Sequence, residues 1–318
     1  MNRQMDLLYK YRLFDPERPA EYKRTLQMLR ESKVWMATPS SFNDPFDCQP
    51  SILRNTETEQ RNLATIVGNY RSQIKKALRA DSKLADGKGR PMAHRTLVNL
   101  RRFLESRQPN ERKYQALKKY FLVPPDGEAA LGLLQARLAR IGVLSLSAHP
   151  TEMLMWAHYA SQHSGFCLGF ERSDGSLLKN NAHTKPVNYV DEYLQLGLDS
   201  LELSWSVSVQ DCSISDSMEI DIEEPHLQAV IYTKSTKWDR EQEWRVLVPQ
   251  GRVLSGYPGP LRTVIFGLRC GQESRRLVEE TVQEASHEGT IQFAEIQSRA
   301  GSFDLGIRDL YFGLAQSP

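Results

Sequence analysis

The sequence predicts an α+β fold with a central mixed or antiparallel sheet and a helical insertion between the second and third strands. Short segments rich in β-branched and aromatic residues, several of them alternating between apolar and polar side chains, predict strands. These segments are 7–12, 33–38, 142–147, 165–171, 243–248, 263–267 and 290–296. A long stretch with helical spacing, 56–140, separates the first two from the others. We expect residues 1–318 to form a single α+β domain in which 56–140 is a basic helical insertion.

The first strand carries two kinds of side chain on its two faces. Tyr9 and Tyr11 share one face of segment 7–12, whereas Lys10 and Arg12 share the other. A helix is expected at 21–32, a strand at 33–38 and an aromatic, acidic loop at 40–47. Asn, Asp and Pro in that loop favour a rigid turn, because their side chains bond to the nearby backbone or fix φ.

The formal net charge of +2 is unevenly distributed along the chain. Segment 71–119 contains fifteen Lys or Arg and four Asp or Glu, a net charge of +11. Segment 191–224, which we expect to be rich in loops, contains ten Asp or Glu and no Lys or Arg. The basic segment is a candidate for contact with nucleic-acid phosphates, and the acidic one could shield it. The alternative is that both are solvated faces.

A second informative region follows the insertion. Segment 152–162 predicts a helix that is apolar nearly all round and therefore buried. His158 lies in this helix, where it is either a satisfied core group or a catalytic candidate. In the next strand, 165–171, Gly169 leaves room for another backbone or a ligand.

The stretch 238–248 combines charges with a strand-like pattern. Glu243 and Arg245 alternate with apolar residues, and Glu241 would share their face if the strand began that early. Burying two carboxylates and an arginine costs free energy unless they have partners or a purpose. The stretch is therefore either an ion pair that holds a strand or the site of a catalytic glutamate.

Composition excludes several classes of protein. The chain is 40% hydrophobic and 25% charged, as in soluble globular proteins, and it contains no apolar run long enough for a membrane span. The N-terminus lacks an apolar signal core, so we expect a cytoplasmic protein without membrane contact. The cysteines are scattered and predict reduced thiols, not a disulfide frame or a zinc site. They are Cys48, Cys167, Cys212 and Cys270.

Five motifs occur in a specific order. They are Leu-Tyr-Lys-Tyr-Arg at 8–12, Phe-Asn-Asp-Pro-Phe-Asp at 42–47, Met-Trp-Ala-His-Tyr-Ala at 155–160, His-Ser-Gly-Phe-Cys-Leu-Gly-Phe at 163–170 and Glu-Gln-Glu-Trp-Arg at 241–245. Their order resembles that of an uncharacterised bacterial family of unknown function and covers almost the whole chain. The resemblance implies a setting among phage-defence and mobile-element genes, but it implies no particular chemistry.

The motif order is also similar to that of ADP-ribosyltransferases. Those folds place Arg or His on a first strand, Ser, Thr or Tyr on a second, and Glu at the start of a later strand. The similarity implies NAD as a substrate and Arg12 as a bidentate ligand of its pyrophosphate. Glu243 would stabilise an oxocarbenium-like transition state, and Glu241 would polarise the acceptor. The cofactor-binding candidates besides Arg12 are Thr38, Asn43, Asp44, Trp156, His158 and Tyr159.

Three hypotheses about function stay open. The first is an ADP-ribosyltransferase-like enzyme, acting as a toxin or defence effector on a protein or nucleic-acid acceptor. The second is a hydrolase or nuclease that holds Mg²⁺ between acidic side chains and is helped by the basic helices. The third is a non-catalytic binding or sensor module, in which Arg12 joins a buried ion network with Asp44 or Glu243. The acidic side chains of the second hypothesis are Asp44, Asp47, Glu241 and Glu243.

Overall fold

A computed structural model describes most of the chain, as two compact units. The described residues are 6–53, 56–80, 84–123, 127–197, 204–210, 213–285 and 289–312. The first unit, here called the sheet unit, comprises Met1–Gln49, Leu138–Leu194 and Leu227–Pro318. The second, here called the helical unit, comprises Pro50–Arg137 and Gln195–His226.

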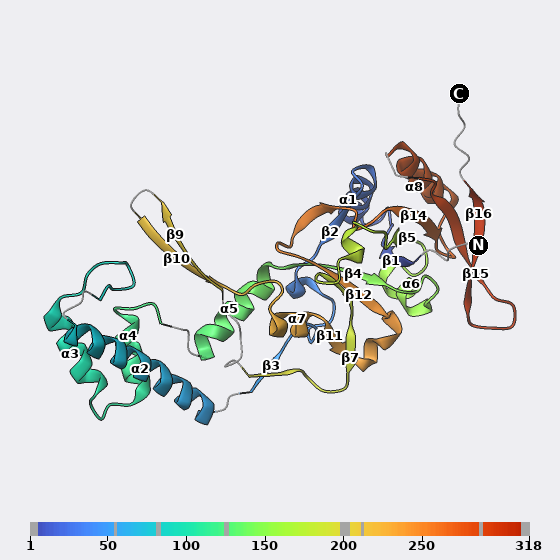
Figure 1. The fold of residues 1–318 in the computed structure, drawn as a ribbon. Helices are drawn as coiled ribbons and strands as arrows, with labels where there is room; N and C mark the ends of the chain where they lie inside the picture. Colours follow the sequence, from blue (N-terminus) through green and yellow to red (C-terminus); the bar gives the residue numbers. More distant parts are fainter. Residues whose placement is uncertain are drawn as a thin grey trace. The chain divides into compact units, whose positions relative to one another are not determined.

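The sheet unit is built on a mixed sheet of eight strands in the order β16-β15-β14-β5-β1-β4-β12-β6 (Figure 1). Only β14 and β15 run parallel to each other among the paired strands of this sheet that the structure describes. The prediction of an α+β fold with a mixed sheet is therefore confirmed. The strands are β1 (Leu7–Arg12), β4 (Gly142–Ser147), β5 (Phe166–Glu171), β6 (Thr184–Pro186), β12 (Glu243–Val248), β14 (Leu261–Phe266), β15 (Gln292–Ser298) and β16 (Leu305–Phe312).

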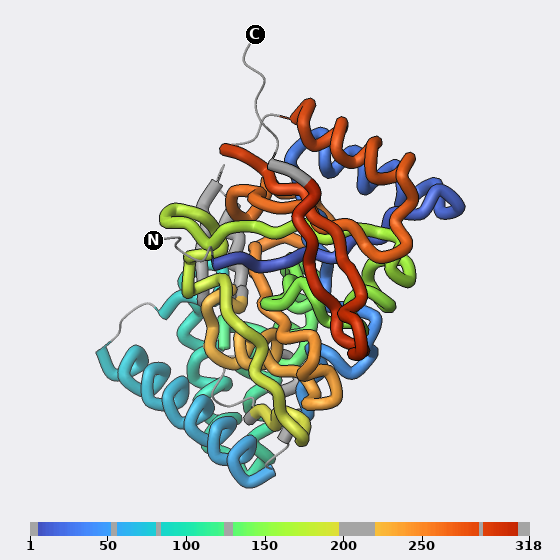
Figure 2. The backbone as a smooth tube through the Cα atoms, turned by 90° about the vertical axis from the view of Figure 1, so that its right-hand side faces the viewer, coloured from blue at the N-terminus to red at the C-terminus, as the bar shows by residue number. Residues whose placement is uncertain are grey.

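The two faces of this sheet are covered differently. One face packs on α1 (Pro19–Arg30) and α8 (Gln272–Glu284), which lie side by side (Figure 2). Their buried leucines and valines form one apolar core with Leu8 and Phe166 of the sheet. The other face carries a smaller apolar cluster around Tyr11 and Trp156. This asymmetry follows from the alternation of side chains along each strand.

Two short sheets complete the strands of this unit. Strand β2 (Lys33–Met36) pairs with β13 (Val253–Gly256) instead of joining the main sheet, and Ala37 then forms a single bridge to Val143. Strand β7 (Asn188–Val190) pairs in parallel with β11 (Thr233–Ser235). The remaining short elements are η1 (Pro39–Ser41), α6 (Met153–Tyr159), η2 (Leu177–Lys179), α7 (Pro225–Ile231) and η4 (Thr236–Glu241).

The helical unit has an apolar core of its own. Helices α2 (Thr56–Arg79), α3 (His94–Leu104) and α4 (Asn110–Lys118) supply most of it. The buried residues of this core are Val67, Ile74, Leu97, Leu100, Leu104, Tyr114, Leu117, Phe121 and Val123. Strands β3 (Ser51–Leu53) and β8 (Gln195–Gly197) pair in parallel, and β9 (Ser204–Gln210) forms an antiparallel pair with β10 (Ser213–Glu219). Helix α5 (Gly127–Arg140) ends the expected helical segment 56–140.

Several local expectations were wrong or incomplete. Helix α6 is shorter than expected and is not buried all round, since Met153 is 47% exposed and Leu154 is 44% exposed. The expected loop-rich acidic segment contains the β9–β10 pair, and the last strand of the sheet, β16, lies beyond the last strand that we expected. Of the cysteines, Cys48, Cys167 and Cys270 are free and buried, whereas Cys212 lies outside the described residues. Among the described residues, no helix is long and apolar enough to span a bilayer.

Candidate functional site

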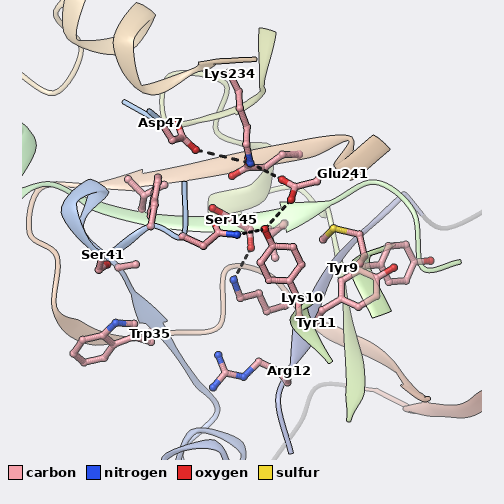
Figure 3. Close-up of a pocket in the computed structure, with 18 residues that line it drawn as sticks. Tyr9, Lys10, Tyr11, Arg12, Trp35, Ser41, Asp47, Ser145, Lys234 and Glu241 are labelled. Atoms are coloured by element: carbon pink, nitrogen blue, oxygen red, sulfur yellow. Dashed lines mark hydrogen bonds and ion pairs between the residues drawn. The ribbon is translucent and has the colours of Figure 1, made fainter. Parts of the chain in front are cut away.

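A cavity of about 290 Å³ opens in the sheet unit beside β1 and β4. These neighbouring strands pair only through Tyr9 and Ser147 in the described register, and Ala37 bridges to β4 further along. The cavity is lined by side chains from β1, β2, α6, β11 and the start of β12, among others (Figure 3). The lining residues are Tyr9, Lys10, Tyr11, Arg12, Trp35, Ala37, Ser41, Phe42, Asn43, Asp47, Val143, Ser145, Leu146, Met155, Tyr159, Lys234, Glu241 and Glu243.

A buried ion network forms one end of the cavity. Arg245, which is fully buried, donates from Nε to Glu243 Oε1 at 2.8 Å and from Nη2 to Glu243 Oε2 at 3.0 Å. It also holds Asp47 through Nη1 at 3.0 Å and Nη2 at 2.6 Å. Lys234 Nζ donates to Glu243 Oε2 at 2.9 Å and lies 3.8 Å from Asp47 Oδ2. Both oxygens of Glu243 and of Asp47 are therefore occupied by cations.

The electrostatics of this network keep its members charged. Burial raises the pKa of Glu243, but Arg245 and Lys234 outweigh it and lower the pKa to about 2. Burial lowers the pKa of Lys234, and the carboxylates of Glu243 and Glu241 raise it above its ordinary value. Since the charges are paired inside the protein, removing one partner would leave a buried charge uncompensated.

Glu241 and Glu243 reach the same lysine from two different elements. Strand β12 begins at Glu243, and Glu241 is instead the last residue of η4, so the two do not alternate on one strand. Between them, Gln242 adopts a left-handed conformation with φ of 42° and ψ of 52°. This turn brings Glu241 Oε2 to 2.5 Å from Lys234 Nζ.

Glu241 has fewer protein partners than Glu243. Its Oε1 accepts a hydrogen bond from the Tyr159 hydroxyl at 2.7 Å, and its Oε2 accepts the bond from Lys234. Asn43 Nδ2 in turn donates to the Tyr159 oxygen at 2.9 Å. A carboxylate has about four lone-pair sites, so Glu241 retains capacity to accept a hydrogen bond from a molecule in the cavity.

The other end of the cavity is cationic. Lys10 Nζ donates to the backbone oxygen of Ser145 at 2.8 Å, and Arg12 Nη2 donates to Thr25 Oγ1 at 3.1 Å and to Met28 Sδ at 3.4 Å. Within the part of the chain that the structure describes, neither cation has a carboxylate at ion-pair distance, and the buried Arg12 Nε has no hydrogen-bond partner. Figure 3 places Lys10 between Arg12 and the Lys234–Glu241 group.

Burial lowers the pKa of both of these cations. Burial and the neighbouring Arg12 together lower the pKa of Lys10 to about 8, although Glu243 and Glu241 act in the opposite direction. Burial and the neighbouring Arg24 lower the pKa of Arg12 to about 10. Two positive charges held close together without an internal anion favour the binding of an external one.

The structure brings together some of the residues that the sequence indicated. Arg12, Glu241, Glu243, Asn43 and Tyr159 all line the cavity. The sequence left open whether Glu243 is a catalytic glutamate or part of an ion pair that holds a strand; in the structure, both of its oxygens are bonded to cations, Arg245 and Lys234.

The other candidates lie outside the cavity lining. Thr38 is buried and bonds to Ser40, and Asp44 Oδ1 accepts a hydrogen bond from the backbone nitrogen of Phe46 at 2.9 Å. Trp156 is fully buried, with its ring nitrogen bonded to the Pro150 oxygen at 2.7 Å.

His158 is exposed and contacts the ring of Tyr159. It does not line the cavity, although it follows the lining residue Met155 by one helical turn.

Sequence reasoning missed Lys10 and Lys234 as functional candidates. Lys10 shares the strand face of Arg12, so the alternation at 7–12 was a sufficient signal for it. Lys234 had no such signal, because its position depends on the turn from α7 into β11.

The acidic side chains are not arranged as an open metal site. Asp47 and Glu243 are bonded to Arg245, and Asp44 belongs to a local turn. Among the described residues there is no group of three or more His, Cys, Asp or Glu placed to hold a metal ion.

Comparison with known proteins gives one match. A family model described as "Protein of unknown function (DUF2971)" matches residues 155–246, which include most of α6, all of β5 and the start of β12. Neither the curated proteins nor the solved structures gave a match. Over these residues the chain is therefore similar to an uncharacterised family, whose description states no activity.

Proposed function

We propose that the cavity binds NAD and that the protein cleaves its nicotinamide–ribose bond, as an ADP-ribosyltransferase-like enzyme with Glu241 as the catalytic carboxylate. One observation carries the proposal: a single cavity has unpaired cations, Lys10 and Arg12, at one end and a carboxylate with spare acceptor capacity at the other. A phosphorylated ribose needs an anion site and a hydroxyl acceptor at the same time.

The cationic end supports phosphate binding. Arg12 retains a buried, unpartnered N–H, and a guanidinium group forms strong charge-assisted hydrogen bonds with phosphate oxygens. Lys10 adds a second positive charge from the same strand face. Trp35 and Tyr9 add aromatic side chains to the cavity lining. The cavity of about 290 Å³ lies at the small end of ligand pockets, so we expect it to enclose the nicotinamide nucleotide half while the adenosine half extends outside.

Glu241 supports the chemistry at the opposite end. In the proposed reaction the bond between ribose C1′ and the nicotinamide nitrogen breaks, and nicotinamide leaves with the bonding electrons. An acceptor hydroxyl, amine or water forms the new bond to C1′ and gives its proton to the Glu241 carboxylate. The charge of that carboxylate also stabilises the positive ribosyl centre in the transition state. Tyr159 and Lys234 are positioning residues, because each holds one oxygen of Glu241.

Incubation of the purified protein with labelled NAD, alone and with cell extract, tests this proposal. We expect the wild type to release nicotinamide or label an acceptor, and Glu241→Gln to lower the rate about 100-fold or more while NAD binding persists. Glu243→Gln is the matched variant, and we expect thermal unfolding to reveal its damage to the ion network. Failure of the wild type to cleave NAD with protein, nucleic acid or water as acceptor would contradict the proposal. An enzyme confirmed in this way would be a candidate toxin or defence effector.

The closed network around Glu243 favours a second candidate, a binding or sensor module. Saturated buried ion pairs are typical of structural positions, and a nucleotide could bind the cations without being cleaved. NAD that stabilises the wild type but remains intact after long incubation would support this second candidate.

A further inference from the structure

A row of cations runs along one side of α2 in the helical unit. Arg71, Lys75 and Arg79 are spaced four residues apart, so they lie on one face of the helix, roughly 6 Å apart along its axis. We call these three residues the basic stripe. All three side chains are exposed, and the buried side of the same helix is formed by Val67, Ile74 and Ala77.

The basic stripe has no internal counter-charge among the described residues. Segment 62–80 contains no Asp or Glu, and the stripe takes part in none of the ion pairs of the described helical unit. Other arginines of the helical unit do have partners: Arg61 pairs with Glu57, and Arg101 pairs with Glu105. Like charges four residues apart destabilise a helix slightly, so the helix carries a cost that an external anion would remove.

The regular spacing of the three cations of the basic stripe indicates that their ligand is a polymer with regularly spaced negative charges. We propose that the basic stripe binds the phosphate backbone of a nucleic-acid duplex without reading its base sequence. This proposal is independent of the function proposed for the cavity. A straight helix about 36 Å long presents its cations in a line, as a duplex presents its phosphates. Phosphate contacts of this kind give affinity and orientation but carry no sequence information.

The surroundings of the stripe argue against single strands. Proteins that bind single strands stack the bases on exposed aromatic side chains. Tyr70, the aromatic residue nearest the stripe in the sequence of α2, packs on Phe121, and its hydroxyl donates to the Leu122 oxygen at 2.6 Å. It is therefore directed into the unit's core, and the stripe itself offers charge without a stacking surface.

Fluorescence anisotropy with a labelled 20-base-pair duplex tests the proposal on the full chain. We expect the triple variant Arg71→Gln, Lys75→Gln, Arg79→Gln to bind roughly tenfold or more weakly than wild type at ~50 mM salt. Its plot of log affinity against log salt should be shallower by about 3, since each lost phosphate contact removes about one unit of slope. A duplex of unrelated sequence should bind the wild type with similar affinity.

The control variant removes three positive charges, as many as the first variant, but from the sheet unit. Lys23→Gln, Arg30→Gln, Lys237→Gln changes three exposed cations of the sheet unit and should keep the wild-type affinity and slope. Absence of duplex binding by the wild type, equal loss in the control, or tighter binding of a single strand of the same length would each overturn the proposal. Circular dichroism of both triple variants distinguishes lost contacts from lost helix.

Discussion

At the scale of single residues, the cavity has two kinds of charged group beside it: ions that are paired with each other, and cations that have no carboxylate partner. Arg245 and Glu243 satisfy each other inside the protein, whereas Lys10 and Arg12 are held in a desolvated place without an anion. A desolvated, unpaired cation lowers stability, and proteins tolerate such groups mainly where function requires them. From the alternation at 243–248 the sequence left open an ion pair or a catalytic glutamate, and it could not assign Glu241 the freer role.

Lys10 should therefore reduce the stability of the folded protein. Its pKa falls from 10.5 to about 8 on folding, so keeping it charged costs free energy below pH 8, and the cost disappears as the pH rises toward 10.5. We expect Lys10→Met to raise the free energy of unfolding by about 1–3 kcal/mol at pH 7, with the gain shrinking by pH 10. Urea unfolding at both pH values measures this. A variant less stable than wild type at pH 7 would show that Lys10 is a structural residue.

Removing a paired charge should instead lower the stability of the folded protein. Arg245→Met leaves the carboxylates of Glu243 and Asp47 without their main partner, and we expect it to lower the free energy of unfolding by about 3–5 kcal/mol. The matched control Arg61→Met breaks an exposed pair with Glu57 and should change stability by less than about 0.5 kcal/mol.

Lowering the pH should reduce the free energy of unfolding of the wild type, because it protonates Glu243 in the same ion network. The pKa of Glu243 is lowered to about 2, so its contribution is fully present above its ordinary pKa of 4.5 and is lost as the pH falls toward 2. Equal acid sensitivity of wild type and Glu243→Gln in urea unfolding would contradict this assignment.

At the scale of elements, the junction of η4 and β12 gives the two carboxylates that line the cavity different partners: Glu243 is held by Arg245 and Lys234, and Glu241 by Tyr159 and Lys234. Gln242 has a left-handed backbone conformation, which costs free energy for any residue that has a Cβ atom, that is, for every residue except Gly. The sequence predicted that Glu241 and Glu243 would share a face if both lay on one strand. In the structure Glu241 belongs to η4, and the turn at Gln242 brings it to the same lysine as Glu243. The strands β1, β4, β5 and β12 followed from local patterns in the sequence. The splaying of β1 from β4, which creates the cavity, depends on pairing between distant segments and has no local signal.

Two substitutions at this junction isolate the backbone effect. Gln242→Ala and Gln242→Gly both remove the side-chain contact with His149, but only alanine keeps a Cβ at a φ of 42°. We expect the glycine variant to be more stable by about 1 kcal/mol in thermal or urea unfolding. An alanine variant of equal or greater stability would show that the turn is not strained.

At the scale of the whole molecule, the chain separates two kinds of positive charge. Lys10 and Arg12 line the cavity of the sheet unit, where we propose that they bind phosphate, and the basic stripe is exposed on the helical unit, where we propose that it binds a duplex. Each unit has its own apolar core, so substitutions in one should leave the local chemistry of the other intact. The charge distribution of the sequence indicated the second kind, and the motif order indicated Arg12 of the first kind but not Lys10.

Calorimetric titration of the full chain with NAD tests the central claim most directly. We expect saturable binding to the wild type and at least roughly tenfold weaker binding to Arg12→Met, because the phosphate loses its guanidinium partner. The control Arg30→Met removes an exposed arginine of α1 and should bind like the wild type. No binding to the wild type, or equal affinity of Arg12→Met and wild type, would contradict the assignment of this cavity as an NAD site.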